Sequence, residues 1–257
     1  MKRIIFTLLY DEGFFVLSRN YRRQKIGNLK WLLDQYKLSE IAYGLDELHI
    51  INISESEETH TDFLKSVETI SSHCFIPICV GGKIQSKRIA QEYFRYGADK
   101  IHLNTALTSK PELCRSIATQ FGEQAVCAGI NFSVSDAVYL HDSDGKRNSA
   151  NFYDHCNYVL DLGVGELSLH SVDNDGTANG LDMRVLDALP HHTETPVILS
   201  GGIGNKKHIA QSLKVDRVDA VATANILNFI GSSFLEARDY CIAEGIALPQ
   251  FDNAILL

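Results

Sequence analysis

The sequence predicts an α/β fold in which strands and helices alternate eight times and close into a (βα)8, or TIM, barrel. Eight short apolar segments rich in β-branched residues alternate with longer segments of helical periodicity along the 257 residues. Moreover, Phe75-Ile-Pro-Ile-Cys-Val-Gly81-Gly82 is echoed by Thr195-Pro-Val-Ile-Leu-Ser-Gly201-Gly202, and the surrounding segments repeat with them. Eight βα units in a chain of this length favour a closed barrel, and the repeat indicates two equivalent half-barrels.

The predicted strands are continuous apolar runs, which is typical of parallel strands buried on both faces. We expect strands at residues 3–9, 47–53, 75–80, 99–103, 124–131, 166–171, 196–200 and 218–223. We expect helices at residues 27–43, 60–73, 86–96, 110–120, 151–162, 182–189, 205–213 and 226–244. The turn signal Asp142-Ser-Asp-Gly145 predicts an extra hairpin after the fifth strand. No linker-like segment interrupts the series, so residues 1–257 are expected to form a single domain.

Composition argues against several kinds of partner. A net charge of −8 disfavours nucleic acid or an anionic membrane as the main partner. No apolar run is long enough to span a bilayer. The six cysteines show neither CxxC pairs nor metal-ligand spacing. We therefore expect reduced thiols in a cytoplasmic protein, and neither a metal nor a cofactor.

Each diglycine directly follows a predicted strand and precedes a helix. The carboxyl ends of the strands carry the site in barrels of this type. Glycines there let backbone N–H groups approach an anion, and the next helix N-terminus favours negative charge. The residues expected to bind phosphate are Gly81, Gly82, Asn104, Thr105, Gly176, Gly201, Gly202, Ala224 and Asn225. Two such cradles predict a ligand with two phosphates. The alternative is that the glycines only permit tight turns.

A second polar cluster follows the sixth strand. The segment Ser171-Val-Asp173-Asn-Asp175-Gly176-Thr177 places two carboxylates beside a glycine at the same end of the barrel. A carboxylate in this position can act as an acid or a base, and we expect that role of Asp175. The alternative is an ordinary polar turn.

Several motifs occur in a fixed order: Lys2-Arg3-Ile4-Ile5, Asp46-Glu47-Leu48, Val80-Gly81-Gly82, Gly97-Ala98-Asp99-Lys100, Asn104-Thr105, Asp173-Asn-Asp175-Gly176-Thr177, Ser200-Gly201-Gly202 and Gly204-Asn205. In this order they resemble the cyclase subunit of imidazole glycerol phosphate synthase, an enzyme of histidine biosynthesis, over nearly the whole chain. The resemblance implies a (βα)8 barrel that forms a heterodimer with a glutaminase. Such a barrel takes ammonia from its partner and closes an imidazole ring on a bisphosphate ribonucleotide.

The chain departs from this family where the family carries its catalytic aspartates. The resemblance implies an aspartate at the end of the first strand and another after the fifth, but these positions hold Leu9 and Asn131. A third aspartate, on the second strand, is replaced by Asn52. Acid–base catalysis contributes roughly 10²–10⁴-fold per group, so the family reaction should be nearly abolished. We expect any chemistry to involve Asp175 and Asn131, and whether the chain is an enzyme stays open.

The opposite end of the barrel keeps the family pattern. The resemblance implies a ring of charged residues that gates the passage of ammonia, and Arg3, Glu47, Lys100 and Glu166 match it. Asp99 matches a position that faces the glutaminase. The alternative is a salt-bridged plug that only stabilises the barrel floor.

This combination resembles a divergent branch of the family that belongs to surface-polysaccharide pathways. There the ammonia is expected to serve amidine formation on an acetamido sugar, with a separate sugar amidotransferase. The basic first loop, residues 17–30, fits that branch and can bind phosphate or nucleotide-sugar oxygens, or it is simply solvated. Two other hypotheses remain: a histidine-pathway cyclase with displaced catalytic groups, and an ammonia conduit without chemistry of its own.

Overall fold

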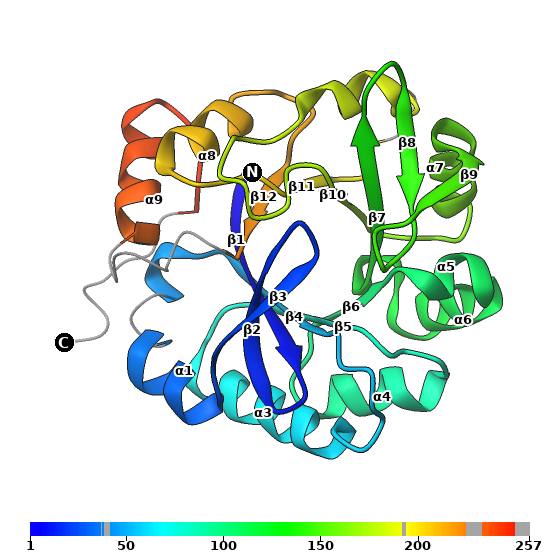
Figure 1. Ribbon diagram of the computed structural model, residues 1–257, viewed down its shortest axis with the longest axis vertical. Coiled ribbons are helices and arrows are strands. Elements are labelled where there is room, and N and C mark those ends of the chain that lie inside the picture. Colours follow the sequence, from blue (N-terminus) through cyan, green and yellow to red (C-terminus); the bar gives the residue numbers. More distant parts are fainter. Residues whose placement is uncertain (37, 39–41, 192–193, 225–232, 250–257) are drawn as a thin grey trace.

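The computed structural model describes the chain except for residues 37, 39–41, 192–193, 225–232 and 250–257. Eight parallel strands form a closed ring, because β12 pairs with β1 and β10 pairs with β7. Helices surround this ring (Figure 1). The strands are β1 (Arg3–Asp11), β4 (Glu47–Asn52), β5 (Ile78–Gly81), β6 (Lys100–Leu103), β7 (Val126–Val134), β10 (Glu166–Ser171), β11 (Val197–Ser200) and β12 (Ala220–Thr223). The protein is therefore a (βα)8 barrel, as predicted, and every predicted strand is present.

The helical layer follows the predicted pattern with local differences. The α-helices are α1 (Leu29–Tyr36), α3 (His60–His73), α4 (Lys87–Arg95), α5 (Thr105–Ser109), α6 (Pro111–Phe121), α7 (Phe152–Leu160), α8 (Lys206–Leu213) and α9 (Ser233–Ala243). Short 3-10 helices are η1 (Ala42–Gly44), η2 (Glu123–Ala125) and η3 (Met183–Ala188). None of the described helices is both long and apolar enough to cross a membrane.

The helix predicted at 182–189 is present, but it is the 3-10 helix η3 and not an α-helix. The carboxylate of Asp182 accepts a hydrogen bond from the Arg184 N–H, and Leu189 N–H closes onto Leu186 O three residues back. Pro190 follows and cannot continue a helix. The helix expected at 27–43 begins two residues later, because Gly27 ends a strand instead. The start of the helix expected at 226–244 lies outside the described residues.

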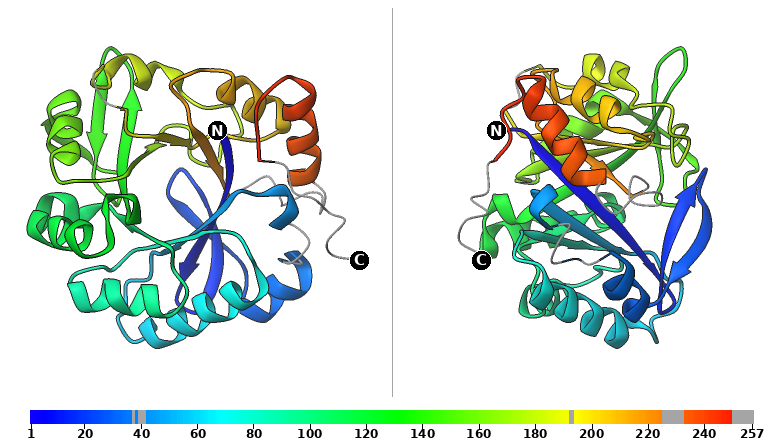
Figure 2. Two further views of the ribbon diagram at one scale, coloured as in Figure 1. Left: turned by 180° about the vertical axis from the view of Figure 1, so that it is seen from behind. Right: turned by 90° about the vertical axis from the view of Figure 1, so that its left-hand side faces the viewer.

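Each half of the barrel opens with a long strand that leads into an antiparallel hairpin. β1 is followed by β2 (Phe14–Arg19) and β3 (Arg22–Gly27), and β7 by β8 (Val138–His141) and β9 (Arg147–Asn151). Both hairpins lie at the end away from the N-terminus (Figure 2). The second was predicted, but the first was expected to be a basic loop. Its turn residues Asn20 and Tyr21 take the left-handed conformation, with φ of 50° and 60°, without the glycine that usually marks such a turn.

Two aspartates confirm that the halves are built alike. Asp99 precedes β6, the last strand of the first half, and its carboxylate accepts a hydrogen bond of 2.8 Å from the Ile78 N–H on β5. Asp219 precedes β12, the last strand of the second half, and accepts an equivalent 2.8 Å bond from Val197 on β11. Each carboxylate thus fixes the last two strands of its half.

The apolar core has two parts. The larger lies between the strands and the helices and contains fully buried side chains such as Phe6, Phe63 and Tyr93. The smaller lies inside the barrel and consists of Ile5, Cys79, Cys127, Ile198, Ala220 and Ala222. All six cysteines of the chain are free and buried.

The diglycine after β11 offers a test of this packing. Gly202 has φ of 108°, and a Cβ there would lie 2.1 Å from Gly180 O. Gly13 has φ of 85° but open space around it. We expect Gly13→Ala to lower the free energy of unfolding by about 1 kcal/mol through backbone strain. Gly202→Ala should cost at least about 2 kcal/mol more through the clash. Urea denaturation checks this; equal losses would contradict it.

Candidate functional site

A cavity of about 890 Å³ opens at the carboxyl ends of the strands. Each of the eight barrel strands, or the loop directly after it, contributes to its wall. Of the residues predicted from sequence, the cavity brings together Gly82, Asn104, Thr105, Asn131, Asp175, Gly176, Gly201, Gly202 and Ala224. Gly81 lies behind the wall, and Asn225 is outside the described residues. The two halves therefore contribute to one shared cavity.

The glycines of the cavity wall are required by their neighbours. Gly82 has φ of 87°, and a Cβ there would lie 1.9 Å from Asn52 O. Gly201 has φ of 90°, and its Cβ would meet Ser171 O at 2.5 Å. Close packing of backbone on backbone thus accounts for both glycines. This agrees with the alternative that the glycines only permit tight turns. The same turns leave main chain at the cavity surface, so their role in binding phosphate stays a prediction.

Asn104 is partly used inside the protein. Its side-chain amide donates a 3.0 Å hydrogen bond to Gly129 O, which ties β6 to β7. Thr105 begins the five-residue helix α5 at the cavity edge. Only part of the donor capacity expected of Asn104 therefore remains for a ligand.

Four charged side chains close the other end of the barrel. Arg3 donates to Glu47 at 2.6 Å and contacts Glu166 at 2.7 Å. Lys100 Nζ lies 2.9 Å from Glu47 and 3.0 Å from Glu166. Each carboxylate is therefore shared by both cations. We call these four residues the ion-pair ring.

Glu47 is the most buried member of the ion-pair ring. Its other oxygen accepts a 3.1 Å hydrogen bond from His49 Nε2. Burial opposes ionisation, but the His49 bond and the charges of His49, Lys100 and Arg3 outweigh it and lower the pKa of Glu47 to about 2. Burial likewise opposes the charge on Lys100, yet the two glutamates raise its pKa above the ordinary value. Glu47 and Lys100 are therefore charged around neutral pH.

Three histidines between the ion-pair ring and the cavity mouth were missed by the sequence interpretation. His49, His102 and His170 all line the cavity. The signal was available, because side chains alternate along a strand. Since Glu47 and Lys100 face inward, His49 and His102 must face inward as well.

His102 occupies space that two glycines leave open. A Cβ on Gly129 would lie 2.3 Å from His102 Cε1, and one on Gly81 would lie 2.7 Å from His102 Cβ. Burial, together with His49 and His170, lowers the pKa of His102 to about 3. The His102 imidazole is therefore neutral at physiological pH. Gly129 and His102 therefore form a matched pair, because any larger residue at 129 would clash with the imidazole.

Asp175 connects the loop after β10 to the first hairpin. One carboxylate oxygen accepts hydrogen bonds from Ser18 Oγ at 2.5 Å and from the Tyr21 N–H at 3.0 Å. Its backbone oxygen accepts a further bond from the Asn20 N–H. The side chain is buried, and its other oxygen lies 3.7 Å from His170 Nε2. Asp175 thus fixes the β2–β3 turn over the cavity; its predicted role as acid or base remains a prediction.

The positions where the resemblance implies aspartates contain no titratable group. Leu9 lines the cavity with an apolar side chain. The Asn131 amide donates a 2.9 Å hydrogen bond to Asp142 O in the second hairpin. Asn52 accepts a hydrogen bond from the Ser54 N–H. None of these three can transfer a proton near neutral pH.

The basic segment places one cation at the cavity. Arg23, on β3, lines the cavity and lies 3.3 Å from Asp11. Lys25 lies over the Phe14 ring at 4.3 Å from its centroid. Arg23 is therefore the basic residue of this segment that is placed to contact a bound ligand.

Glu47, His49 and Cys79 bring three metal-ligating atoms within 4.8 Å of one another. Both oxygens of Glu47 are already bonded to Arg3, Lys100 and His49. Burial raises the pKa of the Cys79 thiol well above its ordinary value, so it stays protonated. This donor set does not fit a cation.

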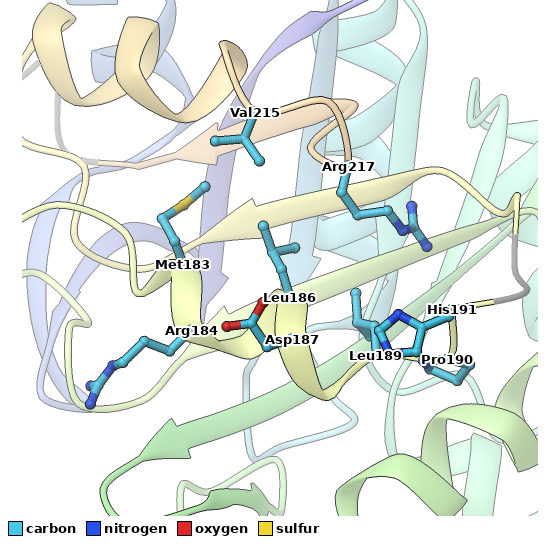
Figure 3. Close-up of a pocket in the computed structure, with 9 residues that line it drawn as sticks. All are labelled: Met183, Arg184, Leu186, Asp187, Leu189, Pro190, His191, Val215 and Arg217. Atoms are coloured by element: carbon cyan, nitrogen blue, oxygen red, sulfur yellow. The ribbon is translucent and has the colours of Figure 1, made fainter.

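A second, smaller cavity of about 610 Å³ lies outside the barrel, beside η3 (Figure 3). Its wall includes Met183, Leu186, Val215 and Arg217. None of the residues predicted from sequence to form the site contributes to it. The main cavity is therefore the candidate site.

The ion-pair ring predicts a pH dependence of stability. Breaking a buried ion pair costs about 3 kcal/mol, so Glu47→Gln should lower the free energy of unfolding by that amount at pH 7. Because the pKa of Glu47 is lowered from 4.5 to about 2, its contribution is complete above pH 4.5 and is lost as pH falls towards 2. Urea denaturation at several pH values should show the difference between wild type and variant shrinking over this window. Glu112→Gln, in an exposed pair with Arg115, should cost no more than about 0.5 kcal/mol.

Comparison with known proteins agrees with this architecture. A sequence profile described as "Histidine biosynthesis protein" matches residues 20–231. The chain is 36% identical over 240 residues to "Putative imidazole glycerol phosphate synthase subunit hisF2" of Parasynechococcus marenigrum, covering 93% of this chain and 89% of that protein. It is 36% identical over 251 residues to "Imidazole glycerol phosphate synthase subunit HisF" of Chlorobaculum tepidum, covering 96% and 98%. The chain therefore belongs to the HisF-type family of imidazole glycerol phosphate synthase subunits.

Proposed function

We propose that this chain is a HisF-type subunit that receives ammonia from a partner glutaminase and delivers it to a phosphorylated or nucleotide-linked ligand. The observation that carries this proposal is the ion-pair ring of Arg3, Glu47, Lys100 and Glu166. It closes one end of a barrel whose other end is the ligand-sized cavity. A ring with this pattern is kept although the aspartates of the family have been lost. Retention of the ring supports retained coupling to an ammonia source.

The barrel interior suits neutral ammonia. The apolar side chains of Ile5, Cys79 and Cys127 belong to the cluster beyond the ion-pair ring. His102 follows and is neutral, because its pKa is lowered to about 3, mainly by burial. Apolar surroundings disfavour ammonium, which would lose its hydration. Ammonia, by contrast, can hydrogen-bond to a neutral imidazole on its way to the cavity.

We place the glutaminase on the face around the ion-pair ring. Asp99, predicted to face the partner, is exposed there, although its hydrogen bond to Ile78 also gives it a structural role. Phe75 lies on the same face just before β5 and is 97% exposed. Aromatic residues are enriched at protein interfaces, so the exposed Phe75 supports placing the partner on this face.

We assign the reaction to a pathway outside histidine biosynthesis. Leu9 and Asn131 remove the acid–base groups on which the family reaction relies, and the basic β2–β3 hairpin covers the cavity. The combination fits amidination of an acetamido sugar in surface-polysaccharide biosynthesis in the cytoplasm, with a separate sugar amidotransferase. The similarity to HisF subunits favours the second candidate, a histidine-pathway cyclase. A conduit without chemistry is the third.

Turnover of the family substrate separates the first two candidates. We expect no measurable product from the bisphosphate ribonucleotide with ammonium chloride, because two acid–base groups worth roughly 10²–10⁴-fold each are missing. The double variant Leu9→Asp, Asn131→Asp should gain detectable turnover. The HisF subunit of Chlorobaculum tepidum serves as the positive control. Wild-type turnover comparable to that control would establish the histidine pathway instead.

Partner binding is tested at Phe75. We expect the chain to co-purify with a glutaminase from cells that carry the gene with its natural neighbours. Phe75→Glu should weaken that complex by at least about 2 kcal/mol, since an aromatic side chain at the proposed interface becomes a charge. Tyr153→Glu changes an exposed aromatic side chain at the start of α7 and should leave the affinity unchanged. Isothermal titration measures both affinities. A barrel that purifies as a monomer, without any glutaminase, from cells that keep the natural gene neighbourhood would contradict the proposal.

A further inference from the structure

His170 is a titratable side chain of the cavity that lies beside one of the lost carboxylates. It belongs to β10, and the sheet register places it beside Asn131 on β7 and beside Ser200 on β11. Paired residues of neighbouring parallel strands point to the same face and lie about 4.8 Å apart. His170 therefore enters the cavity one strand away from the position where the resemblance implies a catalytic aspartate.

Both ring nitrogens of His170 have defined partners. Nδ1 lies 3.0 Å from Ser200 Oγ, and Nε2 lies 3.7 Å from a carboxylate oxygen of Asp175. The negative carboxylate favours the tautomer with the proton on Nε2, which leaves the Nδ1 lone pair towards Ser200. The Ser200 hydroxyl has a second acceptor, Leu169 O at 3.3 Å. Nδ1 can thus be released to a ligand while the hydroxyl stays hydrogen-bonded.

The groups around His170 keep it neutral and able to accept a proton. Burial lowers its pKa below the ordinary value, while the charge of Asp175 opposes this shift. The edge of the Tyr21 ring contacts the imidazole, and burial raises the pKa of Tyr21, so the phenol is uncharged. His102 faces it from β6 and is also neutral. Among the residues that the structure describes, Asp175 is therefore the one charged group that interacts with the His170 imidazole.

We propose that His170 is the acid–base residue of the cavity and that Asp175 is its positioning residue. This inference rests on the proposed function, because it takes ammonia as the nucleophile. The ligand is a phosphorylated carbonyl compound anchored beside the neighbouring Gly201-Gly202 turn. The ammonia nitrogen forms a bond to the carbonyl carbon, and the π electron pair moves to the oxygen. His170 takes one proton from the nitrogen and returns it to that oxygen, which gives a carbinolamine and leaves the imidazole neutral.

The first test follows the amide nitrogen of glutamine in cells that carry the gene with its natural neighbours. Cells are fed glutamine labelled with ¹⁵N in the amide group. Labelled phosphorylated and nucleotide-linked compounds are then compared between the wild type and a strain that lacks the gene. A label that disappears in the deletion strain identifies the product. An unchanged label pattern would contradict the proposed function, and the inference with it.

His170→Asn tests the inference alone. Asparagine keeps a polar side chain but cannot titrate, so we expect at least about a 100-fold loss of the labelled product. His155→Asn, a matched change on α7 outside the cavity, should leave the product unchanged. Both variants must keep the melting temperature and bind the glutaminase. A loss of less than about tenfold in folded His170→Asn would overturn the assignment while leaving the proposed function intact.

Asp175→Asn allows a second test, the pH dependence of the rate, which would not shift if Asp175 had only a structural role. Removing the carboxylate lowers the pKa of His170 further, so the acid limb of the rate profile should shift to lower pH. The rate of ¹⁵N transfer in lysates between pH 5 and 8 measures this. An acid limb at the wild-type position would overturn the positioning role. This profile also tests the proposal if His170→Asn fails to fold.

Discussion

The ion-pair ring is the constraint on which the interior of the barrel depends. Two buried glutamates each contact both an arginine and a lysine, so removing one member leaves charges unbalanced in a poorly solvated place. The ion-pair ring also fixes which residues of its strands face the lumen between the ring and the cavity. Because side chains alternate along a strand, Glu47, Lys100 and Glu166 direct every second residue of β4, β6 and β10 into the lumen. Those strands therefore bring His49, His102 and His170 to the cavity.

Neutral imidazoles in the lumen require space that the rest of the barrel must leave open. His102 fits because Gly81 and Gly129 lack side chains on the neighbouring strands. Its neutrality follows from the same crowding, since burial and two nearby histidines lower its pKa. From the ion-pair ring inward, the lumen thus passes from charged to apolar side chains and then to the neutral imidazole of His102. That order suits a small neutral base better than an ion.

Features set by local sequence patterns could be predicted, whereas features that depend on contacts between distant segments could not. The eight strands were found because burial on both faces produces continuous apolar runs. The first hairpin was missed because Asn20 and Tyr21 turn without glycine, and the 3-10 form of η3 because Asp182 and Pro190 favour a tight short helix. The cavity histidines carry only the alternation of strand side chains as a signal, since none of them belongs to a motif of the family. Contacts between distant segments, such as Asp175 with Ser18, leave no local pattern in the sequence.

The proposed acid–base residue lies in one half of the duplicated scaffold only. Glu47 and Glu166 are equivalent in the repeat, so the counterpart of His170 is Ile51, an apolar residue. Likewise, Asp175 from the second half fixes the hairpin of the first half through Ser18 and Tyr21. Gly82 and Gly201 are equivalent positions of the two halves, with φ of 87° and 90°, so two phosphate sites at these turns would not by themselves fix the direction of a bisphosphate. The proposed acid–base group at His170 would remove that ambiguity, because only one orientation of the ligand would bring its reactive carbon to β10.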